Sequence, residues 1–254
     1  MMNTDRYAKM WNVPFRIGAY DFFIPINFDQ SLKATFDALA PAPDEHILDV
    51  GCGSGRVLLH AGPWLQSGGR LTGIDIAEGG LTFAKNRATT LGVESQVSLV
   101  QGDMRSLSDA LDGTFDGAMV HFAVYTLSSE ADRARTLQQI ARVLRPGGRL
   151  AITVPSEGYR ARPLIRDARV RESRRSDIST PVRLFRKWVL YSFMEVATRR
   201  HVESKLDVDV FHRYTREELE AHLKEAGFTD IYIEQLHGVE SYRATAVKDT
   251  RLPD

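Results

Sequence analysis

The chain has 254 residues, 43% of them hydrophobic, and 33 basic residues balance 33 acidic ones. This is enough apolar material for one α/β domain with additional elements, while the zero net charge excludes an overall basic field of the kind that attracts nucleic acid. The single cysteine, Cys52, excludes an internal disulfide and a cysteine-based metal cluster, and because we find neither a signal peptide nor a membrane-spanning apolar run, we expect a cytoplasmic protein with no metal site.

The first forty residues combine a predicted helix with many aromatic side chains. Leu32, Phe36, Leu39 and Ala40 follow helical spacing. Seven aromatic residues precede or enter this helix, namely Tyr7, Trp11, Phe15, Tyr20, Phe22, Phe23 and Phe28. We assign residues 1–40 to an N-terminal helical unit whose aromatic side chains either pack on the core or cover a ligand.

The stretch 47–57 is the most informative in the chain. An apolar run ends at Asp49, and Gly51, Gly53 and Gly55 follow at alternate positions. This pattern predicts a strand that turns tightly into a helix, because glycine permits the backbone angles and lets a ligand approach bare peptide. The spacing differs from the G-x-G-x-x-G of dinucleotide-binding loops, and no Gly-Lys-Ser/Thr follows as in a P-loop. Asp49 would repel a pyrophosphate but would suit a positively charged amino group.

Two further acidic residues stand at predicted strand ends. Asp75 ends a strand over 70–76, 24 residues after Gly51, where doubly wound folds carry a ribose-binding carboxylate. Asp103 follows a strand that contains Val97, Leu99 and Val100. Ligands of open α/β sheets bind outside the carboxyl ends of the strands, so these acids would face one ligand. The alternatives are a helix N-cap for Asp75 and a purely conformational role for the glycines.

The remaining elements alternate between helices and strands. We predict a helix Glu78–Leu91, a strand Phe115–His121, a helix through Leu137, Ile140, Ala141 and Leu144 that ends at Pro146-Gly147-Gly148, and a strand over 149–154. Thr215 and Glu218 form a capping box that opens a helix with Leu219, Leu223 and Ala226, and strands Phe228–Leu236 and 242–247 follow. The alternation predicts a parallel sheet. Its core spans 41–154, and 213–254 completes it.

Residues 155–212 interrupt this alternation with a basic, helical insertion. Its basic residues are Arg160, Arg162, Arg166, Arg169, Arg171, Arg174, Arg175, Arg183, Arg186, Lys187, Arg199 and Arg200, against the acids Glu157, Asp167, Glu172, Asp177, Glu195 and Glu203. An apolar patch at 188–194 lies among them. The insertion is expected to act as a cap over a substrate site. The alternatives are a homodimer interface, an interfacial helix on anionic lipid, and a solvated basic face.

In order and spacing, these motifs resemble those of the class I S-adenosylmethionine-dependent methyltransferases. The matching residues are Leu48-Asp49-Val50-Gly51-Cys52-Gly53-Ser54-Gly55, Gly73-Ile74-Asp75, Gly102-Asp103-Met104, Phe115-Asp116 and Leu144-Arg145-Pro146-Gly147-Gly148. They span about 44–154, with a weaker match over 215–247. The resemblance implies a doubly wound, Rossmann-like α/β sheet of seven strands in the order 3-2-1-4-5-7-6, with the last strand antiparallel.

The resemblance also implies S-adenosyl-L-methionine as cofactor and a set of residues that bind it. The glycine loop would hold the methionine part, Asp75 both ribose hydroxyls, and Asp103 with Met104 the adenine. The N-terminal unit would form a lid. The full cofactor set is Tyr20, Asp49, Gly51, Cys52, Gly53, Asp75, Ile76, Asp103, Met104, His121 and Phe122. Met104 has packing as an equal alternative, and Cys52 is expected to be a small packing residue rather than a nucleophile.

Methyl transfer is an in-line displacement that depends on orientation, and a general base is needed only when the acceptor loses a proton. His121, at the end of the fourth strand, is the candidate base, with Tyr125 beyond it and His201 and His212 as second choices. Related enzymes usually carry a small polar residue at this position, so the alternative for His121 is a strand-end histidine bonded to backbone. Acceptor contacts are predicted for Trp11, Tyr20, Tyr125, Tyr159, Trp188, Tyr191 and His212.

The sequence therefore predicts O- or C-methylation of a small, partly apolar acceptor, with the similarity nearest to quinone-type and natural-product methyltransferases. The Asn-Pro-Pro-Tyr signature of amino-methylating nucleic-acid enzymes is absent, since Val120-His121-Phe122-Ala123 stands there. We expect no nucleic-acid partner. The alternatives are a non-catalytic cofactor-binding protein, an RNA-modifying enzyme supported by the basic insertion alone, and an NAD-dependent reductase, which the glycine spacing disfavours.

Overall fold

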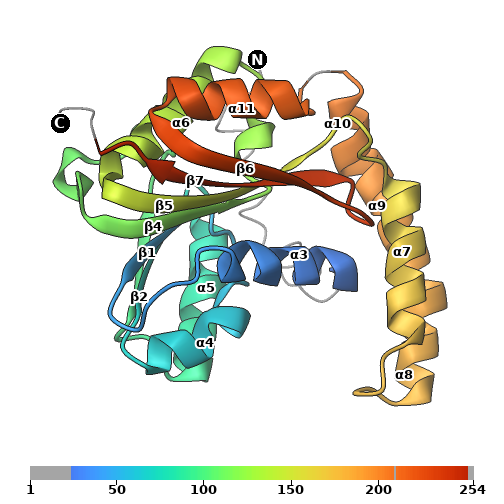
Figure 1. The fold of residues 1–254 in the computed structure, drawn as a ribbon. Helices are drawn as coiled ribbons and strands as arrows, with labels where there is room; N and C mark the ends of the chain where they lie inside the picture. The colour runs from blue at the N-terminus through green and yellow to red at the C-terminus, as the bar shows by residue number, and fades with distance from the viewer. Residues whose placement is uncertain (1–23, 209, 251–254) are drawn as a thin grey trace.

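The computed structural model describes residues 24–208 and 210–250, which form a seven-stranded sheet covered by helices on both faces (Figure 1). The strands are β1 (His46–Val50), β2 (Arg70–Asp75), β3 (Val97–Gln101), β4 (Phe115–His121), β5 (Leu144–Pro155), β6 (Phe228–Leu236) and β7 (Ser241–Lys248). They lie in the order β3-β2-β1-β4-β5-β7-β6, and β7 runs antiparallel to both of its neighbours. The predicted fold class and strand order are confirmed.

The parallel register brings the functional strand ends to one edge. Val50 pairs with Ile74, and Asp75 pairs with Gln101, so that the chain leaves β1, β2 and β3 at the same level. His121 at the end of β4 pairs with Thr153 of β5. The acidic residues that follow or end these strands therefore meet at the carboxyl edge of the sheet, as ligand-binding positions do in open α/β sheets.

Side chains that alternate along the strands build two apolar layers. Ile47 packs toward α3 (Ile26–Asp37), α4 (Leu58–Gln66) and α5 (Glu78–Leu91), whereas Leu48 packs toward α6 (Glu130–Val143) and α11 (Arg216–Glu225). Figure 1 shows these two groups of helices on opposite faces of the sheet. The continuous burial of Ile47, Leu48, Asp49 and Val50 along β1 is typical of parallel strands covered on both faces.

The insertion is helical, as predicted, and forms a hairpin at the carboxyl edge of the sheet. Its elements are α7 (Ala161–Ser173), α8 (Thr180–Phe185), the π-helical turn η3 (Arg186–Leu190), α9 (Tyr191–Thr198), the π-helical turn η4 (Arg199–Glu203) and α10 (Ser204–Leu206). Figure 1 shows α7 and α9 side by side beyond the end of β5. Asn27 of α3 fastens this hairpin by donating hydrogen bonds to the carbonyl oxygens of Leu164, at 2.8 Å, and Gly238, at 2.8 Å.

Local signals place several boundaries correctly. Thr215 caps α11 by accepting a hydrogen bond from the backbone N–H of Glu218 at 3.0 Å. The beginning of β5 is a correction, because the strand starts at Leu144 rather than at Arg149. Leu144 already pairs with Phe115, and a bulge then accommodates the residues up to Arg149, including Gly147 with a φ of 75°. Among the described residues, no helix is long and apolar enough to cross a membrane.

Candidate active site

The glycine loop after β1 turns the chain into α4 and leaves its backbone open to a cavity. Gly51, Gly53 and Gly55 have φ values of 75°, 52° and 66°, in the left-handed region that favours glycine. A Cβ on Gly51 would lie 2.5 Å from the Cβ of Ala123, whereas a Cβ on Gly53 would meet nothing within 4 Å. Close packing against Ala123 therefore requires a glycine at position 51, whereas the peptide at Gly53 borders open space that a ligand can fill.

The carboxylates of Asp49 and Asp75 lie together at this loop. Asp49 is 4% exposed, and its burial, together with the neighbouring charge of Asp75, raises its pKa to about 7. Asp75 accepts hydrogen bonds from the backbone N–H groups of Gly53 and Ala77, each at 2.8 Å, and its burial raises its pKa as well. Two acidic groups that disfavour each other's ionisation form a site that suits a cationic or hydrogen-bond-donating ligand. Ala77, and not Asp75, is the N-cap residue of α5.

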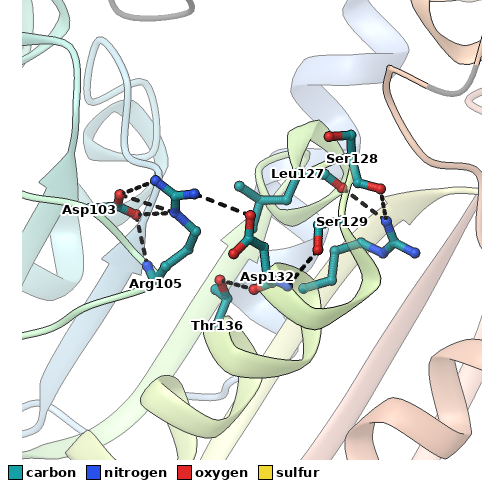
Figure 2. Close-up of polar contacts among 8 residues, drawn as sticks. Asp103, Arg105, Leu127, Ser128, Ser129, Asp132 and Thr136 are labelled. Carbon is teal, nitrogen blue, oxygen red and sulfur yellow. Dashed lines mark hydrogen bonds and ion pairs between the residues drawn. The ribbon is translucent and has the colours of Figure 1, made fainter. Parts of the chain in front are cut away.

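Beyond Asp75, an arginine clamp borders a second hollow. Arg105 donates hydrogen bonds from Nε to Oδ1 of Asp103, at 3.0 Å, and from Nη2 to Oδ2, at 2.6 Å, while its Nη1 reaches Asp132 of α6 at 3.2 Å (Figure 2). These hydrogen bonds hold the pKa of Asp103 below its usual range. The hollow is lined by Gly51, Ile74, Asp75, Ile76, Gly102, Asp103, Met104, Arg105, Phe122, Ala123, Thr126, Leu127, Ser128 and Asp132. It shares Gly51, Asp75 and Phe122 with the first cavity, so the two adjoin at these residues.

His121 stands where β4 meets the cavity, half-buried against α3. Its Nε2 lies 2.9 Å from the hydroxyl of Ser31, which itself donates to the carbonyl oxygen of Phe28 at 2.7 Å. Because a serine hydroxyl carries one proton, this arrangement assigns the imidazole proton to Nε2 and leaves Nδ1 as the acceptor. Burial lowers the pKa of His121 to about 3, so the ring is neutral near pH 7.

Phe122 has a strained backbone at the junction of the two hollows. Its φ is 50°, an unusual value for a non-glycine residue, and its N–H donates to the carbonyl oxygen of Thr153 at 2.9 Å. The ring contacts those of Phe28 and Tyr125, with centroids 4.8 and 5.9 Å apart. Strain of this kind gathers at functional positions, where the surrounding structure holds it in place.

The part of the first cavity that lies away from the carboxylates is mainly apolar and aromatic. Its wall comes from the start of α3, from the segment after β4, and from the inner side of the hairpin. The lining residues there are Ile24, Pro25, Phe28, Leu32, His121, Phe122, Tyr125, Tyr159, Leu164, Met194, Thr198 and Val202. Sequence reasoning missed Leu164, Met194, Thr198 and Val202. The helical spacing of residues such as Leu190, Tyr191 and Met194 indicates that they are buried. It does not reveal which of them borders a cavity.

The structure gathers most of the predicted site residues around these two hollows, and it places others elsewhere. Trp188 is 61% exposed and lies on the outside of the hairpin. Tyr191 is fully buried and donates a hydrogen bond to Glu172 at 2.6 Å. His212 pairs with Glu218 at 2.7 Å, and its backbone N–H donates to Tyr125. None of these three lines either hollow. Trp11, Tyr20 and the side chain of His201 lie outside the described residues.

Comparison with known proteins shows that the chain is similar to methyltransferases. Residues 47–148 match the family described as a methyltransferase domain. Over 117 residues the chain is 36% identical to a demethylmenaquinone methyltransferase of Symbiobacterium thermophilum, a match that spans 46% of this chain and 45% of that protein. Over 114 residues it is 38% identical to an O-methyltransferase of Aspergillus sclerotiorum, spanning 45% of this chain and 41% of that protein. The chain thus spans less than half the length of these relatives.

Solved structures agree with the fold. A SAM-dependent methyltransferase from Aquifex aeolicus superposes with a TM-score of 0.59 at 17% identity, covering 92% of this chain and 97% of that one. A phosphoethanolamine N-methyltransferase of Haemonchus contortus, solved with S-adenosyl-L-methionine, gives a TM-score of 0.63 at 16% identity, covering 93% of this chain and 57% of that one. At these identities the likeness concerns the fold alone.

Proposed function

We propose that the chain transfers a methyl group from S-adenosylmethionine to a small, partly apolar acceptor by O- or C-methylation, and the match of residues 47–148 to a methyltransferase domain supports this proposal. The observation that carries this proposal is that the two hollows adjoin at Gly51, Asp75 and Phe122. One end of the space is acidic and bordered by bare glycine peptide, and the other end is walled by aromatic and aliphatic side chains. A charged cofactor and an apolar acceptor would meet at Phe122.

The residues at the acidic end fit the cofactor. The buried carboxylate of Asp49 would complement an ammonium group, and Asp75 would accept hydrogen bonds from ribose hydroxyls while its backbone contacts hold it in place. Asp103, which Arg105 orients, would border the adenine together with Ile76 and Met104. When bound, the cofactor supplies a methyl group already activated by its sulfonium. The protein's own contribution is then to bind, to align and to exclude water.

A transfer assay tests the proposed function. The protein is incubated with isotope-labelled cofactor and a panel of phenols, hydroquinones, charged amines and RNA, and the labelled products are identified by mass spectrometry. We expect labelling of apolar hydroxylated compounds. Labelling of RNA alone would contradict the proposal, and so would binding of S-adenosylhomocysteine without transfer to any acceptor of the panel.

Filling the apolar end of the cavity is expected to block the acceptor selectively. Met194 is 7% exposed and lines the cavity, whereas its neighbour Phe193 is 58% exposed on the other side of α9. Met194→Trp should lower kcat/KM by roughly 5–150-fold, since overpacking the acceptor end costs about 1–3 kcal/mol, while affinity for S-adenosylhomocysteine stays within about twofold. Phe193→Trp is the matched control and should behave as wild type. An equal loss of kcat/KM in both variants would show that the apolar end of the cavity is not the acceptor site.

His121 is expected to act as a neutral hydrogen-bonding group near pH 7, because its pKa is about 3. A general base works best when its pKa is close to the working pH. His121→Asn should therefore lower turnover without removing any inflection from the pH–rate profile between about pH 5.5 and 8.5. Kinetics of both proteins across this range give the comparison. An inflection that is present in wild type and missing in the variant would instead identify His121 as the titrating base.

The arginine clamp is expected to support cofactor binding. Arg105→Ala removes the charge-assisted hydrogen bonds that orient Asp103, and such bonds contribute about 1.5–3 kcal/mol each. Affinity for S-adenosylhomocysteine should fall by roughly 10-fold in calorimetry. The matched control is Arg142→Ala, since Arg142 binds Asp109 and Asp112 with similar exposure but lines neither hollow. An unchanged affinity in the Arg105 variant would contradict the expected role of the clamp.

A further inference from the structure

The outside of the hairpin carries a row of large apolar side chains that face solvent. This outer face consists of Val182, Phe185, Trp188, Val189, Phe193 and Val196, which are between 48% and 61% exposed. Five of them, at positions 182, 185, 189, 193 and 196, recur at intervals of three and four residues, so they lie on one side of the continuous helical segment α8–η3–α9. A contiguous patch of this kind on a protein surface marks an interaction site.

The opposite side of the same helical segment already has its partners. Leu190, Tyr191 and Met194 are buried between this segment and the rest of the protein. Met194 and Thr198 also line the apolar end of the cavity. The outer face is therefore not needed to close the core, and α9 carries Phe193 and Val196 of this face as well as the cavity-lining Met194 and Thr198.

The outer face has a basic border. Arg199 and Arg200 are exposed and continue the helical segment three and four residues after Val196, and the ammonium of Lys187 lies 5.1 Å from the centre of the Trp188 ring. Two acidic residues of the hairpin are engaged in ion pairs with its arginines. Glu195 pairs with Arg162 and Arg169, and the fully buried Glu172 pairs with Arg175 and Arg186. The exposed Asp177 pairs with Arg175, and the charges that adjoin the apolar row at Lys187, Arg199 and Arg200 are positive.

We propose that the outer face docks on an anionic lipid surface, with its apolar side chains inserted at the interface and its arginines against the headgroups. An apolar row with basic flanks is the arrangement that gives interfacial binding, through buried apolar area and attraction to anionic lipid. A second copy of the chain would bring the same basic border against this one. The segment 1–23 carries Arg6, Lys9 and Arg16 against Asp5 and Asp21, so it offers no complementary charge either.

This docking would place the acceptor cavity one helix away from the lipid. The docking proposal rests on the outer face alone, so it holds whether or not the protein transfers methyl groups. If both hold, an acceptor dissolved in the membrane would enter the apolar end of the cavity beside Met194.

Vesicle co-sedimentation of the full chain tests the docking. Vesicles of phosphatidylcholine alone are compared with vesicles of phosphatidylcholine and phosphatidylglycerol in equal parts, at low and high salt. We expect binding to the mixed vesicles that decreases with salt, and little binding to phosphatidylcholine. The double variant Arg199→Glu/Arg200→Glu should weaken partitioning by roughly 30-fold or more, because each basic residue near an anionic surface contributes about fivefold.

The apolar contribution is tested by Trp188→Ser/Phe193→Ser, which should also abolish most of the binding. The controls are Leu59→Ser/Tyr232→Ser, exposed by 46% and 62% elsewhere, and Arg70→Glu/Lys85→Glu, exposed on other elements. Both controls should bind as wild type. The proposal would be overturned if the control variants lost as much lipid binding as the test variants. It would also be overturned if binding did not depend on lipid charge. It would also be overturned by a lipid-independent dimer that the Trp188/Phe193 variant dissociates in sedimentation velocity, or by lipid binding that appears only after removal of residues 1–23.

Discussion

Asp75→Ala is expected to weaken binding of S-adenosylhomocysteine by more than about tenfold. The carboxylate stands at the end of β2, where both hollows share it, and the N–H groups of Gly53 and Ala77 hold it in a fixed orientation. A hydrogen bond to a charged acceptor contributes about 1.5–3 kcal/mol, which corresponds to roughly 10–150-fold in affinity. Titration calorimetry at a temperature where circular dichroism shows a folded variant measures the loss.

A second ligand separates ribose binding from a structural role of Asp75. The substitution also leaves two backbone N–H groups without their acceptor, so the variant should unfold at a lower temperature. Wild-type protein should discriminate strongly between S-adenosylhomocysteine and its 2′,3′-dideoxy analogue, and the variant should bind both with similar affinity. If the variant kept the wild-type discrimination, Asp75 would not be the ribose acceptor. Asp44→Ala, on an exposed turn, should change neither affinity nor stability.

Asp49→Asn is expected to stabilise the cofactor-free protein and to weaken cofactor binding. Burial and the charge of Asp75 raise the pKa of Asp49 to about 7, from 3.8. Each pKa unit corresponds to about 1.4 kcal/mol, so we expect the amide to increase the free energy of unfolding by at least ~1 kcal/mol at pH 8. The same substitution removes the charge that would complement the ammonium of the methionine moiety, and affinity for S-adenosylhomocysteine should fall by about tenfold.

The pH dependence of unfolding tests the direction of this change in stability. Because the folded state holds the Asp49 proton more tightly than the unfolded state, the ionised carboxylate destabilises the fold above pH 7. Relative to the Asn variant, unliganded wild-type protein should therefore gain stability as pH falls from about 7 toward 4. Chemical denaturation across this range measures the difference, and a gap between the two proteins that is independent of pH would contradict it. Asp116→Asn is a contrast, since Asp116 pairs with Arg145 and its replacement should destabilise.

The sequence was informative about the acidic end of the cavity because the determinants of this end are local. Asp49 and Gly51 belong to one strand–turn–helix unit. Asp75 ends β2 and Asp103 follows β3, and the parallel register brings these two strand ends to the same edge. The role of Arg105 was missed, although it stands two residues after Asp103, because its second partner, Asp132, comes from α6. Periodicity predicts that α6 exists but not which carboxylate faces the hollow.

The acceptor side could not be predicted in the same way, because distant segments build it. Phe28 and Met194 meet in one cavity only through the packing of α3 against the hairpin, which Asn27 fastens. The run 188–194 misled the prediction because both sides of this helix are apolar. Trp188 was predicted as an acceptor contact, whereas in the structure Met194 lines the apolar end of the cavity and Trp188 lies on the outer face.

The most direct test of the account is a calorimetric titration of the purified chain with S-adenosylhomocysteine and, separately, with NAD. The carboxylates of Asp49 and Asp75 beside the open glycine loop suit an amino-acid tail and a ribose, and they disfavour a pyrophosphate. We predict saturable, one-site binding of S-adenosylhomocysteine and no measurable heat with NAD. Tighter binding of NAD, or binding of neither ligand, would contradict the assignment of the cofactor and with it the proposed function.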